Sequence, residues 1–457
     1  MRLSRANLDS LPDDVAQPGT VDGAPQGRIV HFGLGAFARA HLAWYTQAAN
    51  SAATERWRIT GVSLRSPDVA QRLMPQDGLF TLTERSGEEA YTQVVDTIDR
   101  VLVAREQGGR IVQALSDPAC SITSFTVTEK GYCRGDDGSL DTQAAAEGFY
   151  PMVEAALSRR RAQGGTGITF LSCDNLPANG AVLRALLLEW LNSRDPGLAE
   201  WTAGHCTFPC TMVDRIVPAP TDADCAALAD RIGMTDEGAV FTERFSQWVI
   251  EDDFAGPRPS WELAGAQLVG DAAPYETAKL RMLNGAHSAL AYAGLAAGHR
   301  FVHEAVADPA CRNLAERLMR DEAAPSVQPA PGQDLARYAD RLMTRFADPA
   351  LAHRLEQIAM DGSEKIPQRW LETAARRKRA GEPSPAILRS IAAWLRHLED
   401  GSRVNDPRGP ALRDLVSMRE KAEAARAVFG PGGPLASNWE PEEDDLRAIA
   451  QHWEELS

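Results

Sequence analysis

The stretch RIVHFGLGAFARAH, at residues 28–41, constrains the fold more than any other part of the sequence. Its β-branched and aromatic residues predict a short strand that runs into Gly33 and Gly35. A helix is predicted directly after the glycines, because the apolar residues of AFARAHLAWYTQAAN recur at helical spacing. The stretch is therefore expected to form a strand, a tight turn and a helix.

The same alternation continues to about residue 265. WRITGVSL predicts a second strand and PDVAQRL a helix after it. Further strands are expected at FTLTE, TQVVDTI, SITSFTV and GITFLSC, and a long helix at AVLRALLLEWLNS. Strands that alternate with helices indicate a mostly parallel sheet covered on both faces.

The character of the sequence changes near Tyr275. Long amphipathic segments such as SPAILRSIAAWLRHLED take over, and strand-like runs almost vanish. A chain of 457 residues is also too long for one ordinary core. We therefore expect an α/β domain at residues 1–270 and a mainly α-helical domain at residues 271–457.

The overall charge argues against several classes of partner. The formal net charge is −15, whereas nucleic acids and anionic membranes attract a basic face. No apolar run suits a signal peptide or a membrane span, so a cytoplasmic protein is expected. Seven cysteines without CxxC spacing read as reduced thiols, and His205, Cys206 and Cys210 match no zinc pattern. We expect no metal site.

The glycine turn is consistent with a dinucleotide site. Gly33 and Gly35 would let the backbone approach a pyrophosphate at a helix N-terminus, and Ala38 is small enough for close packing. A plain tight turn is the alternative interpretation. The second strand ends in Arg65 and Ser66 rather than in an acid, so the choice between NAD and NADP stays open.

A second unusual feature is the helical stretch ETAKLRMLNGAHSALAYAG at residues 276–294. At about 100° per residue, Glu276, Lys279, Asn284 and His287 share one arc of about 140° among apolar neighbours. A buried lysine tends to a lowered pKa, which suits a general base, and an amide or imidazole can bind a developing oxyanion. The alternative is that Lys279 extends to solvent and His287 is an ordinary core histidine.

SCDNLPANG places a further amide, Asn175, just after a predicted strand. Parallel sheets present catalytic groups at such strand ends. Asp-Asn before Leu-Pro is equally common in turns, so a turn residue is the alternative.

Together these stretches resemble the mannitol dehydrogenase family, the long-chain polyol-specific dehydrogenases. The resemblance is carried by eight motifs in family order, IVHFGLGAFARAH, TLTERSG, TVTEKGY, FLSCDNLPANG, FPCTMVDRIVP, WVIEDDF, KLRMLNGAHS and DGSEKIPQR. It implies a Rossmann-type N-terminal domain, a mainly helical C-terminal domain and metal-independent hydride transfer with NAD, with NADP not excluded.

The resemblance also implies roles for individual residues. Lys279 would be the catalytic base, Asn175 and Asn284 the oxyanion-binding pair, and His287 a substrate contact. Asp214 and Glu276 would be supporting acids near the reacting hydroxyl. The expected cofactor-binding residues are Gly33, Gly35, Phe37, Arg39, Arg65, Thr128, Glu129 and Lys130.

The substrate is expected to be a small sugar acid or polyol. GVSLRSPD, SCDNLPANG and DGSEKIPQR look closer to the mannonate and fructuronate branch of the family, whereas Cys210 and Thr211 depart from the mannitol pattern. Lys365 or Arg369 would bind a substrate carboxylate, unless both are ordinary surface cations. D-Mannonate and D-fructuronate are the preferred pair, D-mannitol and D-fructose the alternative. A non-catalytic sugar-acid sensor is the alternative from another class.

Overall fold

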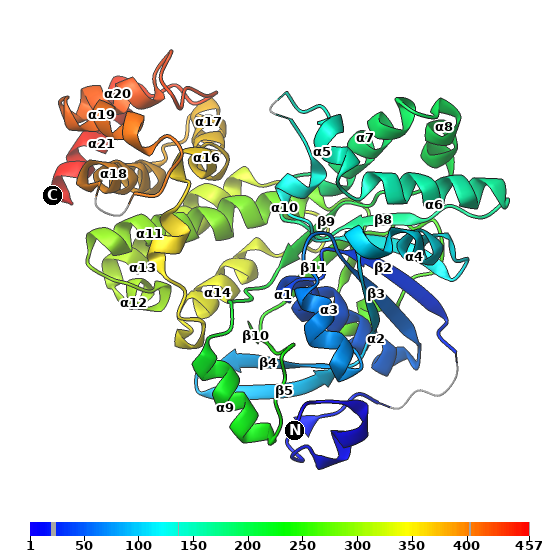
Figure 1. Cartoon of the computed structure of the whole chain (residues 1–457). Coiled ribbons are helices and arrows are strands. Elements are labelled where there is room, and N and C mark those ends of the chain that lie inside the picture. The colour runs from blue at the N-terminus through cyan, green and yellow to red at the C-terminus, as the bar shows by residue number, and fades with distance from the viewer. Residues whose placement is uncertain (20–23, 136, 402–403, 457) are drawn as a thin grey trace. The chain divides into compact units, whose positions relative to one another are not determined.

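The computed structural model describes residues 1–19, 24–135, 137–401 and 404–456 (Figure 1). The chain forms two compact units, Met1–Ala273 and Pro274–Ser457. The largest buried cluster of apolar residues lies wholly in the second unit, and three further clusters lie in the first.

A five-stranded parallel sheet organises the first unit. Its strands lie in the order β6-β3-β2-β7-β8, and every neighbouring pair runs parallel. Their bounds are β2 Gly27–Phe32, β3 Trp57–Ser63, β6 Ile98–Val103, β7 Cys120–Phe125 and β8 Thr169–Ser172. The chain moves outward from β2 to one edge and then returns to add β7 and β8 on the other side. This is the doubly wound arrangement of a Rossmann-type domain, as predicted.

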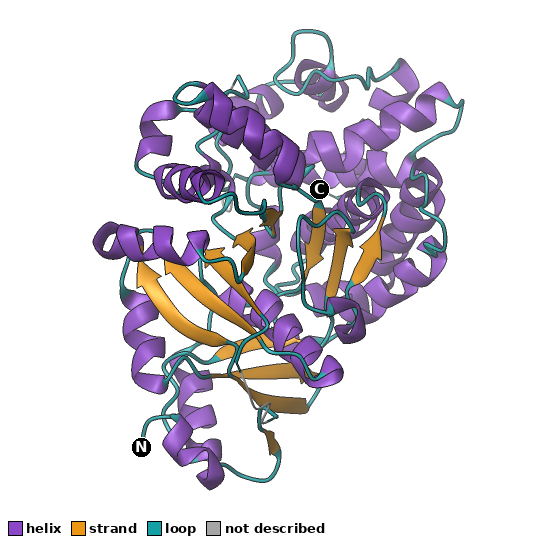
Figure 2. Cartoon of the chain, turned by 90° about the vertical axis from the view of Figure 1, so that its right-hand side faces the viewer, coloured by secondary structure: helices purple, strands orange, loops and turns teal. Residues whose placement is uncertain are grey.

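Both faces of this sheet are covered. Val30 and Phe32 of β2 share a buried cluster with residues of α4 (Ala104–Ser116), α6 (Tyr150–Ala162) and α7 (Asn179–Asn192). Ile29 points to the other face, into a cluster with residues of α2 (Trp44–Ala53). Figure 2 shows the strands of this unit between helices. The other helices of this unit are α1 Ala36–Ala38, α3 Asp68–Leu73, α5 Thr142–Ala146, α8 Pro196–His205 and α9 Asp222–Ile232.

Two smaller sheets complete the first unit. One has the order β1-β5-β4-β10 and the other β12-β11-β9. Their strands are β1 Val15–Ala16, β4 Phe80–Ser86, β5 Glu89–Val95, β9 Thr211–Asp214, β10 Val240–Glu243, β11 Gln247–Glu251 and β12 Gln267–Val269. The single strand expected at TQVVDTI is wrong, because the chain changes sheets between β5 and β6. Asp96 and Thr97 make that change, held by hydrogen bonds to Gln47 and to the carbonyl of Ala43.

The second unit is built from helices, as predicted. They are α10 Ala273–Ala278, α11 Gly285–Ala296, α12 Val302–Ala307, α13 Pro309–Arg317, α14 Leu335–Phe346, α15 Leu355–Ala359, α16 Gly362–Ile366, α17 Glu372–Arg379, α18 Pro385–Asp400, α19 Gly409–Ser417, α20 Lys421–Phe429 and α21 Glu443–Glu455. Nine residues of α11 are buried, which places this helix in the core of the unit. Three π-helical turns interrupt the α-helices, at Lys279–Asn284, Leu318–Ala323 and Pro367–Leu371.

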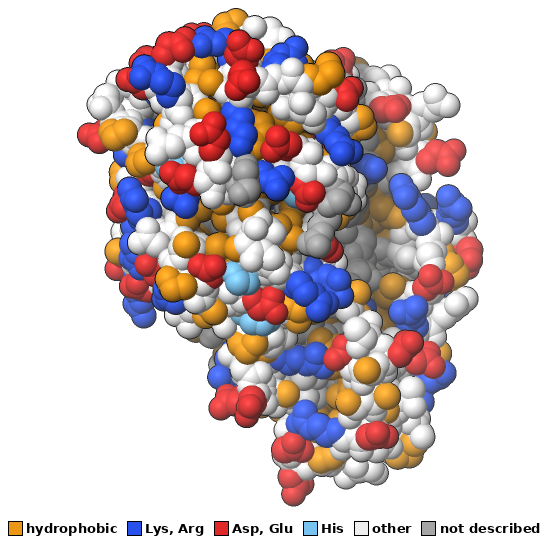
Figure 3. Space-filling model, turned by 90° about the vertical axis from the view of Figure 1, so that its left-hand side faces the viewer, with side chains coloured by type: hydrophobic (Ala, Val, Ile, Leu, Met, Phe, Trp, Pro, Cys, Tyr) orange, Lys and Arg blue, Asp and Glu red, His pale blue; other side chains and the backbone are white. Residues whose placement is uncertain are grey.

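The surface carries charges of both signs. On the face shown in Figure 3, Lys and Arg side chains lie interspersed with Asp and Glu. Among the described helices, none combines the length and the apolar character that crossing a membrane requires.

Candidate active site

The glycine turn follows β2, the strand from which the chain builds the central sheet first to one side and then to the other. β2 ends at Phe32, and Gly33 has a φ of +90°. A Cβ on Gly33 would stand 2.1 Å from the carbonyl oxygen of Thr126, which follows β7. Gly35 is exposed, and an added Cβ there would meet only the Gly33 carbonyl oxygen, at 3.8 Å. The turn therefore needs glycine at Gly33, whereas at Gly35 it leaves open space beside a helix N-terminus, which suits a pyrophosphate.

Phe37 and Arg39 follow in the helix. Phe37 is half-buried and stacks on His41 with ring centroids 5.1 Å apart. The Arg39 guanidinium is buried, donates from Nε to the Gly35 carbonyl at 3.2 Å and also donates to the Gly238 carbonyl. Burial lowers the pKa of Arg39 to about 10. These bonds support the turn from within the protein, and a direct contact of either side chain with the cofactor stays a prediction.

Arg65 lies exposed just beyond β3. Within the described residues its guanidinium has no hydrogen bond or ion pair. Burial raises the pKa of the nearby Cys133 thiol, and the charge of Arg65 opposes that shift only in part. The position fits contact with the ribose side of a dinucleotide and does not choose between a hydroxyl and a phosphate there.

The loop after β7 carries the three other expected cofactor residues. Thr128, Glu129 and Lys130 are exposed, and Glu129 and Lys130 begin the short 3₁₀ helix Glu129–Tyr132. Thr128 has a φ of 64°, a strained conformation for a β-branched residue. Its backbone N–H donates to the carboxylate of Asp174 at 2.9 Å. The loop after β7 is thus tied to the loop after β8.

Asn175 and Asp214 belong to the same unit. Asn175 is exposed in the loop between β8 and α7, directly after Asp174. Asp214 is the last residue of β9 and is buried, with its backbone opposite Gln247 of β11. The placement of Asn175 after a parallel strand agrees with the reason for which the sequence singled it out.

Lys279, in the second unit, starts the π-helical turn Lys279–Asn284 and is 9% exposed. Glu276 precedes it in α10, and both Glu276 and Asn284 are half-buried. A rotation of 100° per residue does not hold through a π-turn, because its hydrogen bonds span five residues instead of four. The angular argument from the sequence therefore needs correction, although the four polar residues do lie on one continuous helical stretch.

A second π-turn braces the first. Arg369, in the π-turn Pro367–Leu371, donates to the Asn284 carbonyl at 3.3 Å and to the Ser288 hydroxyl at 2.6 Å. Its buried neighbour Trp370 donates from Nε1 to the Gly285 carbonyl at 3.0 Å. These donors satisfy carbonyls at the end of the first π-turn, where the α-helical bonding pattern is interrupted.

His287 lies among cations. Its ring stacks on Phe346 with centroids 5.2 Å apart and meets His353 edge-on at 5.0 Å. Burial, and then interaction with the His353 ring and with the positive charges of Arg345, Arg369 and Lys365, hold the pKa of His287 well below its ordinary value. In the described part of the chain neither ring nitrogen of His287 has a hydrogen-bond partner. The ring is thus neutral and able to bind a substrate hydroxyl.

The two cations expected to bind a carboxylate lie close to this ring. Burial and Arg369 lower the pKa of Lys365, whose ammonium group donates to the Met360 carbonyl and lies 3.8 Å from Asp361. Burial lowers the pKa of Arg369 to about 10. Arg345 and His353 complete the cluster and were missed by the sequence reasoning. They come from α14 and a short loop, and no spacing in the sequence relates them to His287.

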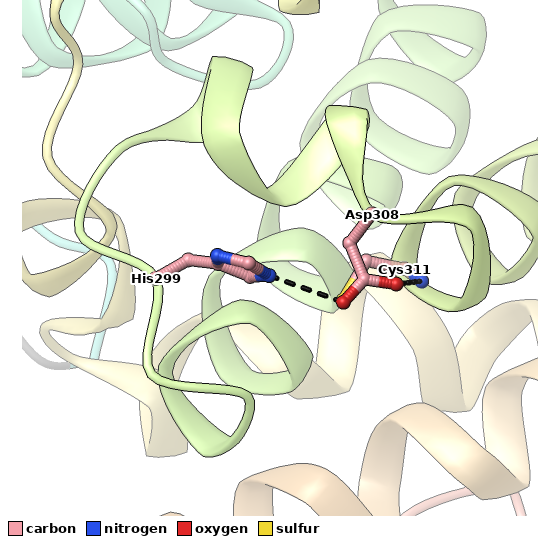
Figure 4. Close-up of side chains that lie close together, drawn as sticks. All are labelled: His299, Asp308 and Cys311. Atoms are coloured by element: carbon pink, nitrogen blue, oxygen red, sulfur yellow. Dashed lines mark hydrogen bonds and ion pairs between the residues drawn. The ribbon is translucent and has the colours of Figure 1, made fainter.

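One group of side chains has the chemistry of a metal site. His299, Asp308 and Cys311 approach one another in the second unit (Figure 4). Asp308 caps α13 through Oδ1, and its Oδ2 accepts from His299 Nε2 at 3.1 Å. Burial raises the pKa of Cys311 to about 11. A helix cap and an ion pair account for these contacts. No other described group meets a metal geometry, and His205 instead bonds the Trp201 carbonyl.

These features define a class of protein: a Rossmann-type dinucleotide-binding domain joined to a helical domain that carries a buried lysine. The sequence matches the mannitol dehydrogenase Rossmann domain over residues 27–263 and the mannitol dehydrogenase C-terminal domain over residues 271–430. The chain belongs to the mannitol dehydrogenase family of oxidoreductases, which confirms the resemblance seen in its motifs.

Relatives with full-length similarity carry several activities. The chain is 36% identical to D-mannonate oxidoreductase of Escherichia coli, over 97% of this chain and 96% of that protein. It is 35% identical to mannitol 2-dehydrogenase of Phaeosphaeria nodorum, over 99% and 82%. The solved mannitol 2-dehydrogenase of Pseudomonas fluorescens, in a ternary complex with NAD and D-mannitol, is 35% identical, covers 100% and 97%, and has a TM-score of 0.82.

Proposed function

We propose that this protein is an NAD-dependent dehydrogenase that oxidises a secondary alcohol of a linear aldonate to the keto sugar acid, with D-mannonate and D-fructuronate as the preferred pair. The observation that carries the proposal is the 9% exposed Lys279, at the start of a π-turn that ends in Asn284. π-Turns inside α-helices are frequent at functional sites. D-Mannitol and D-fructose are the alternative pair.

The residues of the first unit fit a dinucleotide. Gly33 makes the turn, Gly35 leaves room for a pyrophosphate, and Arg65 and Thr128–Lys130 are exposed at the ends of β3 and β7. When bound, NAD supplies the hydride acceptor. The mannitol 2-dehydrogenase relative was solved with NAD. We therefore favour NAD. NADP is the alternative, because Arg65 could bind its 2′-phosphate.

The chain's own residues handle the proton and the charge on oxygen. Neutral Lys279 accepts the proton of the substrate hydroxyl while the carbon loses its hydride. The amides of Asn175 and Asn284 donate hydrogen bonds to the oxygen as negative charge develops there. His287 binds a neighbouring hydroxyl, and Asp214 and Glu276 stand beside the proton route. In the reducing direction the protonated lysine returns the proton.

The cations around His287 favour an acidic substrate. Arg345, Lys365 and Arg369 all lower the pKa of His287, so several positive charges lie close to one ring. A substrate carboxylate could accept charge-assisted hydrogen bonds from Lys365 or Arg369, whereas an uncharged hexitol could form only neutral ones at that end. The 36% identical D-mannonate oxidoreductase supports the same direction.

The test compares two substrates that differ at one terminus. D-Mannonate carries a carboxylate where D-mannitol carries a hydroxymethyl group, so the ratio of their kcat/KM values isolates the contribution of that charge. With NAD, we expect D-mannonate to be favoured by at least about tenfold, the ratio that one charge-assisted hydrogen bond supplies. Turnover of D-mannitol alone would favour the alternative. If the protein bound a sugar acid but did not turn it over with either NAD or NADP, the result would support a non-catalytic sensor and contradict the proposal of a dehydrogenase.

A further inference from the structure

The loops after β7 and β8 are joined by one half-buried carboxylate, that of Asp174. Asp174 Oδ2 accepts the backbone N–H of Val127 at 2.9 Å and the Tyr132 hydroxyl at 2.8 Å. Its other oxygen, Oδ1, accepts the backbone N–H of Thr128 at 2.9 Å. One side chain thus receives three hydrogen bonds from the loop that we expect beside the nicotinamide.

The direction of the protons follows from the acceptor. Both oxygens of Asp174 already accept backbone N–H groups, so neither carries a proton toward the loop and the Tyr132 hydroxyl donates to Oδ2. The Ser172 hydroxyl, 2.7 Å from the same Tyr132 oxygen, must then donate to Tyr132. Ser172 is the last residue of β8, and Tyr132 is buried. The network therefore connects the end of β8, through two hydroxyls, to the loop after β7.

A buried side chain, that of Asn179, holds the loop after β8 from its other side. Asn179, 1% exposed at the start of α7, donates from Nδ2 to the Asp174 carbonyl at 3.1 Å and to the Thr211 carbonyl at 3.0 Å. Its Oδ1 accepts the Thr211 N–H at 2.9 Å. The backbone just before Asn175 is thereby fixed to β9, while the Asp174 side chain fixes it to the loop after β7.

The strain at Thr128 explains why a carboxylate is needed. Its φ of 64° is unfavourable for a β-branched residue and persists only where the surroundings hold it. In an asparagine at position 174, an NH₂ group would replace one of the two carboxylate oxygens. Its N–H donors would then face the N–H and O–H donors that Asp174 now accepts. An isosteric asparagine would therefore release the loop although it fits the space.

We propose that Asp174 is a positioning residue for the reaction, which aligns the Asn175 amide and the strained Thr128 backbone through this network. Asp174 itself touches neither the substrate nor the cofactor. The proposal rests on the proposed function in one respect, the role of Asn175 in stabilising charge on the substrate oxygen.

A double-mutant cycle tests this positioning role with wild-type protein, Asp174→Asn, Asn175→Ala and the double variant. If Asp174 acts through Asn175, Asp174→Asn lowers kcat at least about tenfold in the wild-type background and much less in the Asn175→Ala background. Asp141→Asn is the matched control, because the Asp141 carboxylate caps the helix α5 through two backbone N–H groups and has no hydrogen bond to Asp174, Tyr132 or Thr128. Independent effects that multiply in the double variant would overturn the proposal.

A second readout separates this proposal from the proposed function. Backbone amide exchange over residues 126–132 should speed up in Asp174→Asn and stay unchanged in Asp141→Asn, whether or not any substrate turns over. Unchanged exchange in Asp174→Asn would overturn the proposed positioning role of Asp174. Normal turnover in Asn175→Ala would contradict the proposed role of the Asn175 amide in the reaction. Faster exchange in Asp174→Asn would still show that Asp174 holds the loop after β7.

Discussion

At the scale of the residue, Gly33 and Gly35 lie two positions apart and have different structural reasons to be glycine. Gly33 combines a φ of +90° with a Cβ position 2.1 Å from a backbone oxygen, so any side chain clashes with β7's continuation. Gly35 has an ordinary φ of −90° and open space around it. The first glycine serves the fold, and the second leaves room for a ligand.

Replacing each glycine with alanine should separate these roles. Gly33→Ala should destabilise the protein by about 1–3 kcal/mol from backbone strain alone, and the clash with Thr126 adds to that. Gly35→Ala, at a helix N-cap, should cost below about 1 kcal/mol and yet weaken NADH binding at least tenfold. Thermal melts and a fluorescence titration with NADH measure both. Wild-type NADH affinity in Gly35→Ala would place the cofactor elsewhere.

At the scale of the element, β2 and β7 are joined by more than their backbone ladder. His31, fully buried on β2, bonds the Ser124 hydroxyl at 2.8 Å and the Thr126 hydroxyl at 2.9 Å. Burial lowers the pKa of His31 from 6.5 to about 3. The ring is therefore neutral in the folded protein and holds the two strands together just before the glycine turn.

This linkage predicts a loss of stability in acid. Because the unfolded chain binds a proton on His31 near pH 6.5 and the folded protein does so only near pH 3, protonation favours unfolding as the pH falls through that window. Between pH 7 and pH 5, protonation of His31 should lower the free energy of unfolding by about 2 kcal/mol. Urea unfolding of wild type and His31→Gln at both pH values measures it. The variant should lose less stability over this interval, and an equal loss in both proteins would contradict the assignment.

Elements with regular periodicity were predictable, and their irregular parts were not. The strand, glycine and helix around residue 33, and the helical character after Tyr275, follow from apolar spacing that local sequence displays. The π-turn at Lys279–Asn284 escapes such reasoning, because its carbonyls are satisfied by Arg369 and Trp370, about 85 residues away. The change of sheets at Asp96 and Thr97 is likewise set by tertiary hydrogen bonds.

The candidate site shows the same division. Lys279 and Asn175 could be singled out from the sequence, since a lysine in an apolar helix and an amide after a strand are locally unusual. Asp174 and His353 could not, because their importance lies in contacts with Thr128 and with His287 that only the folded chain creates. Family motifs found the residues expected to touch ligands more readily than the residues that hold them.

At the scale of the whole molecule, the proposed labour is divided between two units. The glycine turn, Arg65 and the loop after β7 belong to Met1–Ala273, whereas Lys279 and its helix belong to Pro274–Ser457. Each unit has its own buried core. A change confined to Lys279 should therefore abolish the proton transfer and leave the dinucleotide site as it is.

Turnover and NADH affinity of Lys279→Ala, measured side by side, test the central claim most directly. Loss of a general base predicts a fall in kcat of about 10²–10⁴-fold, with an NADH dissociation constant close to that of wild type. Lys378→Ala is the matched control, because Lys378 pairs with Glu442 at 2.9 Å, far along the chain from the π-turn, and should leave both quantities unchanged. Near-normal kcat in Lys279→Ala, with either D-mannonate or D-mannitol as substrate, would contradict the account.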